Sequence, residues 1–309
     1  MFRELFRQST WYFAGYLINM ILGLVGFTLW TRYFTVEEYG VLSLIGAAIT
    51  FIMPFTKLGL HNSVVRFYSE IRSGKRKYSE TTFYTTFFVG ALIIGIFIGS
   101  LILIAVIFLA PKHVGNVPTY HLFIVASLTF LLMPGNSIYR PFLRVEEKPK
   151  EFVFLSVFGA SFRLLLSILF VFIFLLGLKG LYVSSLCLQL VVFLYVIFSL
   201  KKANKLDISS FSFSFLLEAL YFGVPLIAAQ LSNHLSNIGD RFVIQFLLGP
   251  EAVGLYGVAY GLTSRLKSLF TVWMFVVTPM YVKIWHTKGK EKTEEFLNTI
   301  LDYYLMIAV

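Results

Sequence analysis

Long apolar runs, each about as long as a bilayer core is thick, constrain the fold of this chain more than any other feature. A helix needs about 20 apolar residues to cross roughly 30 Å of hydrocarbon. Only 14% of the residues are charged, whereas a soluble domain carries about 25%. We therefore predict an all-α, polytopic membrane protein with helices at Thr10–Phe34, Val41–Val65, Thr82–Ala110, Thr119–Leu143, Phe152–Leu176, Leu181–Leu200, Phe215–Leu248 and Ala252–Val282, and a ninth that begins near Phe296.

The first and last apolar runs differ from the others in length or in what flanks them. Arg3 and Arg7 precede the first run as in a signal peptide, but that run is too long and has no small-residue cleavage site, so we expect it to be retained. The ninth run has only about 14 apolar residues before Val309, which is marginal for a crossing. We therefore expect a truncated sequence.

Lysine and arginine are concentrated in alternate gaps between the apolar runs. Eighteen share the side of the N-terminus, against three on the other side, Arg32, Lys112 and Lys179. Basic loops stay in the cytoplasm, so we predict a cytoplasmic N-terminus in the cell membrane. The eighteen are Arg3, Arg7, Arg66, Arg72, Lys75, Arg76, Lys77, Arg140, Arg144, Lys148, Lys150, Lys201, Lys202, Lys205, Lys283, Lys288, Lys290 and Lys292.

The net charge of +10 is not a nucleic-acid signal here, because the basic residues lie in short loops beside apolar spans. We expect no nucleic-acid partner. Cys187 is the only cysteine, which excludes a disulfide within the chain and a thiolate metal site. We expect no cofactor and no metal.

Two parts of the sequence resemble each other. Tyr12–Ile18 in the first span is similar to Tyr221–Ile227 in the seventh, and the turn Phe34–Val41 is similar to Leu248–Leu255. Both spans begin on the same side, so the repeat is parallel, a common plan in transporters. We predict an N-terminal lobe of six helices over residues 1–213 and an incomplete C-terminal lobe over 214–309, with the seventh and eighth helices and the start of the ninth.

Five basic residues remain inside spans once topology has explained the rest. A charge in hydrocarbon costs at least ~2.5 kcal/mol, so it tends to face a cavity or a partner. For the three nearest the cytoplasm, Lys57, Arg265 and Lys267, snorkelling to the interface is the alternative. Arg163 lies near the midplane, beyond the reach of snorkelling, and the fifth is Arg241.

The seventh span carries a polar stripe. Gln230, His234, Asn237, Arg241 and Gln245 recur at spacings of four, three, four and four, so they share one helical face. Such a face lines a water-filled cavity, or it packs against other helices with Asp240 and Arg241 each paired across to a neighbour. Shorter stripes occur in the second and eighth spans. Cations without matching acids favour an anionic ligand such as a phosphate or diphosphate.

Several short motifs follow one another along the chain. They are Thr31–Phe34 with Glu37–Gly40, Leu58–Leu60 followed by Val65–Tyr68, Asp240–Arg241 with Gly249, Val253–Tyr256 with Ala259–Tyr260, and Pro279. In this order and spacing they resemble oligosaccharide flippases, the O-antigen and polysaccharide exporters of the multidrug/oligosaccharidyl-lipid/polysaccharide (MOP) superfamily. Lys57 departs from the pattern, because an acidic or neutral residue is common before Leu-Gly-Leu.

The resemblance implies two six-helix lobes around a central cavity, and movement of an undecaprenyl-diphosphate-linked glycan across the cytoplasmic membrane by alternating access. It implies a transporter rather than an enzyme. We expect a monomer that works beside polysaccharide assembly proteins and uses H⁺ or Na⁺ as a coupling ion. The hypothesis assigns substrate contact to Lys57, Arg163, Arg241, Arg265, Lys267, Asn237 and Gln230, and ion coupling to Asp240 and His234.

Two other functions compete with this one. A multidrug cation antiporter of the same superfamily would favour buried carboxylates, but Asp240 is the only acid well inside a span. A membrane glycan polymerase or glycosyltransferase would usually carry a large outer loop or a nucleotide-sugar domain, and every loop here is short.

Overall fold

The structure is a computed structural model that describes the backbone of residues 2–308 and most side chains. The side chains of residues 1–9, 266–276, 278–280, 282–283, 286–288, 303–305 and 307–309 lie outside the described part. The elements are α1 (Phe2–Tyr33), α2 (Val36–Lys57), α3 (Leu60–Arg72), α4 (Glu80–Leu109), β1 (His113–Val114), β2 (Val117–Pro118), α5 (Tyr120–Val145), α6 (Pro149–Ile168), the π-helix η1 (Leu169–Ile173), α7 (Leu178–Lys202), the short 3₁₀ helix η2 (Ile208–Ser210), α8 (Phe213–Gly223), α9 (Pro225–Leu248) and α10 (Pro250–Ala308).

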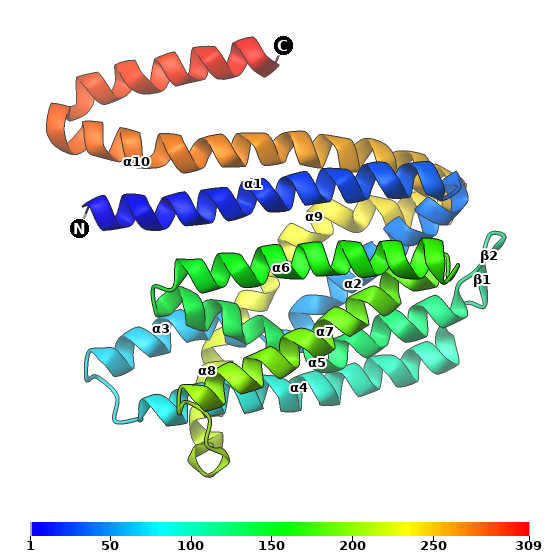
Figure 1. The fold of residues 1–309 in the computed structure, drawn as a ribbon, viewed down its shortest axis with the longest axis horizontal. Coiled ribbons are helices and arrows are strands. Elements are labelled where there is room, and N and C mark those ends of the chain that lie inside the picture. Colours follow the sequence, from blue (N-terminus) through cyan, green and yellow to red (C-terminus); the bar gives the residue numbers. More distant parts are fainter. Residues whose placement is uncertain (1, 309) are drawn as a thin grey trace.

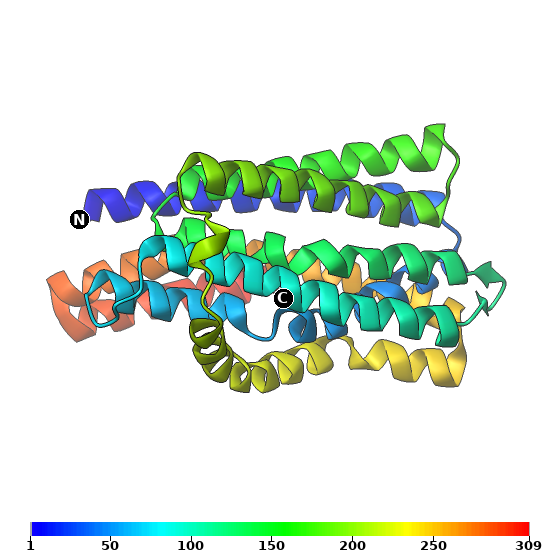
Figure 2. The same cartoon turned by 90° about the horizontal axis from the view of Figure 1, so that it is seen from below.

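The long helices form one bundle (Figures 1 and 2). We call the end with the N-terminus and the turns at 73–79, 146–148 and 203–212 the N-terminal end, and the end with the β1–β2 hairpin the hairpin end. Among the described residues, six helical segments are long and apolar enough to cross a membrane, or seven if α8 and α9 count as one bent span. Phe97, Phe108 and Leu194 are more than half exposed on the outside of this bundle, as lipid contact requires. The prediction of a polytopic helical membrane protein is confirmed.

Spans two and seven are each interrupted, and the interruptions touch. The predicted helix Val41–Val65 is divided at Leu58 and Gly59, which adopt φ of 43° and 71°. The predicted helix Phe215–Leu248 is divided near Val224 by a 44° bend, beside Gly223. A Cβ on Gly59 would lie 2.0 Å from the carbonyl oxygen of Gly223, so the two backbones are in direct contact.

Glycine and proline mark these interruptions unevenly. Gly223 with Pro225 marks a bend. Pro54 and Pro134 lie inside continuous helices, α2 and α5. The interruption of span two comes at Gly59 instead, because a left-handed backbone and a close contact both favour glycine.

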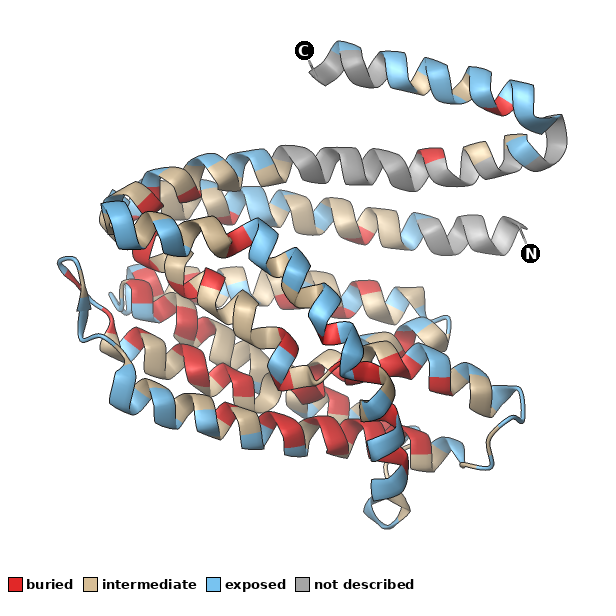
Figure 3. Cartoon of the chain, turned by 180° about the vertical axis from the view of Figure 1, so that it is seen from behind, coloured by how far each residue is buried: buried red, intermediate tan, exposed pale blue. Residues whose placement is uncertain are grey.

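Aromatic packing fixes α8 to the first part of the chain. Phe215 is fully buried, and its ring centroid lies 5.5 Å from that of Phe67 on α3 and 5.7 Å from that of Phe87 on α4. The buried Ser63 donates a hydrogen bond of 2.7 Å to the carbonyl of Ala219. Figure 3 shows buried residues gathered where these helices meet. α8 thus packs into the aromatic core formed by α3, α4 and α5.

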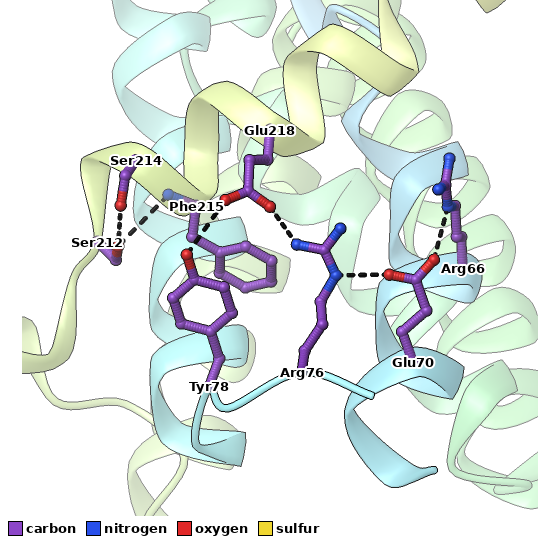
Figure 4. Close-up of polar contacts among 8 residues, drawn as sticks. All are labelled: Arg66, Glu70, Arg76, Tyr78, Ser212, Ser214, Phe215 and Glu218. Carbon is purple, nitrogen blue, oxygen red and sulfur yellow. Dashed lines mark hydrogen bonds and ion pairs between the residues drawn. The ribbon is translucent and has the colours of Figure 1, made fainter. Parts of the chain in front are cut away.

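An ionic network reinforces the same junction at the N-terminal end (Figure 4). Glu70 accepts hydrogen bonds from Arg66 (2.8 Å) and Arg76 (2.5 Å), and Arg76 also pairs with Glu218 of α8. Tyr78 donates to the other oxygen of Glu218 at 3.3 Å. The loop after α3 is therefore bonded to α8.

Glu146 forms a second ionic cluster at this end. Its carboxylate lies 2.7 Å from the ammonium groups of both Lys148 and Lys205. Burial opposes ionisation of Glu146, but hydrogen bonds from these lysines and from Tyr84 outweigh it and hold its pKa below the ordinary value.

At the hairpin end, α2 and α10 meet backbone to backbone. A Cβ on Gly40 would lie 1.9 Å from the carbonyl oxygen of Pro250, and one on Gly254 would lie 2.1 Å from that of Val36. Glycine at both positions allows this approach. The carboxylate of Glu37 accepts hydrogen bonds from the backbone and side-chain nitrogens of Asn116, which hold the hairpin against α2.

Candidate functional site: a cationic cavity in the helical bundle

A cavity of about 1010 Å³ lies among α1, α2, α3, α5, α6 and α7. Four cationic side chains line it: Lys57, Arg140, Arg144 and Arg163. None of its described lining residues is Asp or Glu. We call it the cationic chamber. Its remaining polar lining includes Tyr12, Tyr16, Asn19, His61, Asn136, Ser137, Ser156 and Gln189.

The charges in this chamber have few partners within the protein. Arg163 lies in the middle of α6, yet its side chain is exposed because it faces the open chamber. Within the described part of the chain, neither Arg163 nor Arg140 forms an ion pair or a side-chain hydrogen bond. Among the described residues, the Lys57 ammonium has one hydrogen-bond partner, the sulfur of Met53 at 3.2 Å, which is a weak acceptor. Unpaired cations that face one space repel each other, and an anion between them relieves that repulsion.

Sequence reasoning missed Arg140 and Arg144, because it assigned both to the cytoplasmic loops. Asn136, Arg140 and Arg144 recur at spacings of four and so share one face of α5. That polar face was visible in the sequence. Arg144 lies over the ring of Phe152 at 5.7 Å, which orients it at the edge of the chamber.

A second cavity of about 600 Å³ continues the first toward the hairpin end. The two share lining residues, among them Asn19, Arg163 and Gln189, so Arg163 lies at the boundary between them. Hydroxyl groups dominate the polar lining, and we call this cavity the hydroxyl chamber. They belong to Tyr39, Thr129, Ser167, Tyr182, Ser184 and Ser185.

Arg265 of α10 reaches the hydroxyl chamber but is already bonded. Its guanidinium donates to the carbonyls of Gly261 (2.7 Å) and Gly23 (3.3 Å) and lies 4.2 Å from the ring centroid of Phe27. Part of its role is therefore to join α10 to α1.

The part of the span-seven stripe around Asp240 and Arg241 faces α10 and α2 rather than the cationic chamber. Asp240 accepts hydrogen bonds from the hydroxyl of Tyr256 and from the backbone N–H of Arg241. The Arg241 guanidinium lies 4.6 Å from the ring centroid of Tyr260, in a crevice of about 310 Å³ between α2, α9 and α10. The Nε of Arg241 is buried and has no hydrogen-bond partner in the part of the chain that the structure describes.

The other predicted residues are dispersed. Tyr260 donates a long hydrogen bond of 3.4 Å to Asn237, and Gln230 lies 3.2 Å from the ring nitrogen Nε2 of His61. His234 is partly exposed on α9 and lines none of the cavities described above. The side chain of Lys267 lies outside the described residues. The structure thus brings Lys57 and Arg163 together, and holds Arg241, Asp240 and Asn237 in a separate group.

Several membrane spans around a polar, cation-lined cavity define a multi-pass membrane protein. A sequence model described as "Polysaccharide biosynthesis protein" matches residues 5–285. The chain belongs to this family. No curated protein matches it significantly.

Solved structures with a similar fold are transporters. A MATE in complex with Br-NRF has 18% identity over 91% of this chain and 74% of that chain, with a TM-score of 0.59. An outward-facing multidrug resistance MATE family transporter of the MOP superfamily has 17% identity over 91% and 69%, with a TM-score of 0.61. A MOP superfamily transporter from Pyrococcus furiosus, whose binding pocket is described as reversed in polarity, has 16% identity over 89% and 69%, with a TM-score of 0.58. The chain has the fold of these MOP transporters.

Proposed function

We propose that this protein is a flippase that moves an undecaprenyl-diphosphate-linked oligosaccharide across the cytoplasmic membrane by alternating access, for surface polysaccharide assembly. The observation that carries the proposal is the cationic chamber, in which Lys57, Arg140, Arg144 and Arg163 face one space without a described acid. Arginine binds phosphate oxygens through two parallel N–H donors, and lysine adds a point charge. A diphosphate would neutralise this set of cations.

The glycan and its linker need room as well as charge. The cationic chamber alone, at about 1010 Å³, is at the upper end of the ~300–1,000 Å³ typical of small-molecule sites. The chain's family, polysaccharide biosynthesis protein, fits this class of substrate. We place the N-terminus in the cytoplasm. We also propose that the protein is a monomer that works beside polysaccharide assembly proteins.

The predicted substrate residues other than Lys57 and Arg163 lie on α9 and α10. We propose that Arg241, Asn237 and Lys267 meet the substrate between α9 and α10. Arg265 would meet it at the hydroxyl chamber, and Gln230 beside His61, which lines the cationic chamber. Asp240 and His234 are proposed for coupling to H⁺ or Na⁺. The bond from Tyr256 of α10 to Asp240 of α9 supports a coupling role, because protonation of Asp240 would weaken a contact between two helices.

Export of cationic drugs is the competing function, since similar folds belong to MATE transporters. A cavity whose described charges are all positive repels a cationic drug, which argues against it. A glycan polymerase or glycosyltransferase is disfavoured, because the similar folds are transporters.

Surface polysaccharide display tests the proposal. In a strain that lacks the gene, the double variant Arg140→Gln/Arg163→Gln should fail to restore display, whereas Arg32→Gln should restore it. Arg32 is the matched control, because it is exposed in the last turn of α1 and lines neither chamber. Immunoblots of membranes establish equal expression. Full display by the double variant would remove the cationic chamber from the substrate path.

A further inference from the structure

The hydroxyl chamber differs in chemistry from the cationic chamber beside it. Its only described charges are Arg163, at the boundary, and Arg265, which is bonded to two carbonyls. The rest of the polar lining is neutral. A ligand group that enters here from the cationic chamber meets hydroxyl, amide and aromatic groups.

Four of the hydroxyl groups present acceptors rather than donors. Each of four donates its proton to a carbonyl of its own helix: Thr129 to Ala126 (2.6 Å), Ser167 to Leu164 (2.8 Å), and Ser184 and Ser185 both to Leu181 (2.7 and 3.0 Å). A hydroxyl has one donor and two acceptor lone pairs. The proton is used inside the helix, so the oxygens keep only acceptor capacity for a ligand.

Asn19 adds another acceptor to this lining. Its side-chain nitrogen donates to the carbonyl of Gly15 at 2.7 Å, which leaves its oxygen available. An acceptor-rich lining suits a ligand with many O–H or N–H donors and disfavours a carboxylate or phosphate.

Tyr182 supplies an unsatisfied group at the same place. Tyr182 is 6% exposed and lines the chamber, and its hydroxyl has no hydrogen-bond partner among the described residues. A buried polar group without a partner costs free energy that a bound ligand recovers. Trp30, Phe27 and Tyr39 add aromatic surface to the walls, and flat aromatic rings pack well against the apolar faces of ligands.

The hydroxyl chamber adjoins the place where the diphosphate of the substrate would bind. Arg163 lines both chambers, so a phosphate held by Arg163 in the cationic chamber leaves the group attached to it pointing toward the hydroxyl chamber. From these observations we propose that the hydroxyl chamber is a saccharide subsite that binds the uncharged, hydroxyl-rich sugar next to the diphosphate. This inference rests on the proposed flippase function and assigns the part of the substrate that the cations do not.

The test compares two lipids that differ only in the sugar, undecaprenyl diphosphate and undecaprenyl diphosphate–N-acetylglucosamine, by native mass spectrometry of the purified full chain. Wild type should bind the glycosylated lipid more tightly. Tyr182→Phe removes one buried hydrogen bond, so it should weaken binding of the glycosylated lipid about fivefold to tenfold and leave the sugar-free lipid unchanged. Tyr33→Phe is the matched control, since Tyr33 lies outside both chambers.

Ser185→Ala is the second variant and should show the same selective loss, in case Tyr182→Phe does not fold. Equal affinity of both variants and wild type for the glycosylated lipid would overturn the subsite, as would an equal loss for both lipids. These outcomes leave the flippase proposal intact, provided that Arg140→Gln/Arg163→Gln loses both lipids. If wild type binds neither lipid, the flippase proposal itself fails, and the subsite with it.

Discussion

Replacement of Gly59 by alanine tests the contact between the two interrupted spans. Gly59 has a φ of 71°, in the left-handed region, where an L-residue with a side chain costs about 1–2 kcal/mol. The new Cβ would also lie 2.0 Å from the carbonyl oxygen of Gly223. Nonbonded carbon and oxygen atoms approach only to about 3.3 Å, so one helix has to move by roughly 1 Å.

Overpacking of this kind adds about 1–3 kcal/mol. The two effects together predict that Gly59→Ala destabilises the protein by about 2–5 kcal/mol. Thermal unfolding of the purified protein in detergent measures the effect. Gly46→Ala is the matched control, because Gly46 lies inside α2 and a methyl group added there would have no described neighbour within 4 Å.

The control should raise stability by about 0.5–1 kcal/mol, since alanine favours a helix interior over glycine. The two substitutions thus have opposite predicted signs within one span. An unfolding temperature of Gly59→Ala equal to or above that of wild type would refute the close contact between Gly59 and Gly223.

Three further predictions concern stability and use the same unfolding assay. Ser63→Ala removes a buried hydrogen bond to the carbonyl of Ala219, so we expect a loss of about 0.5–1.5 kcal/mol; no change would mean the bond contributes nothing. Phe215→Ala should cost about 3–5 kcal/mol, because its ring fills the aromatic core at α8; a loss below that of Ser63→Ala would contradict this packing. The pKa of Glu146 is lowered in the folded state, so the unfolded state takes up the proton first and stability should fall as the pH drops through that lowered pKa; Glu146→Gln should flatten this acid dependence, and an unaltered profile would exclude Glu146 as its source.

The spans were predictable because hydrocarbon thickness sets a length that apolar runs must match. Where they are interrupted was less predictable. Proline marks a helix break in soluble proteins, yet Pro54 stays within α2 and the interruption falls at Gly59. What decides this is the approach of Gly223, a tertiary contact between residues far apart in the sequence.

The candidate site was partly predictable for a related reason. Arg163 stood out because a midplane charge needs a cavity or a partner, and it lines both chambers. Arg140 follows the same face of its helix, but a basic residue near a span end fits a topology signal equally well. The stripe around Arg241 has the same period whether it faces water or a neighbouring helix, and here it contacts α10 through Tyr260.

In the proposed function, the cationic chamber carries a diphosphate-linked glycan from one leaflet to the other. The most direct measurement is transbilayer movement of a fluorescent undecaprenyl diphosphate–N-acetylglucosamine in proteoliposomes, followed by chemical quenching of the outer leaflet. We expect wild type and Arg32→Gln to expose the whole lipid pool to the quencher. Arg140→Gln/Arg163→Gln should expose only the half that is already in the outer leaflet. Equal lipid movement in the double variant and wild type would exclude the cationic chamber from the transport path.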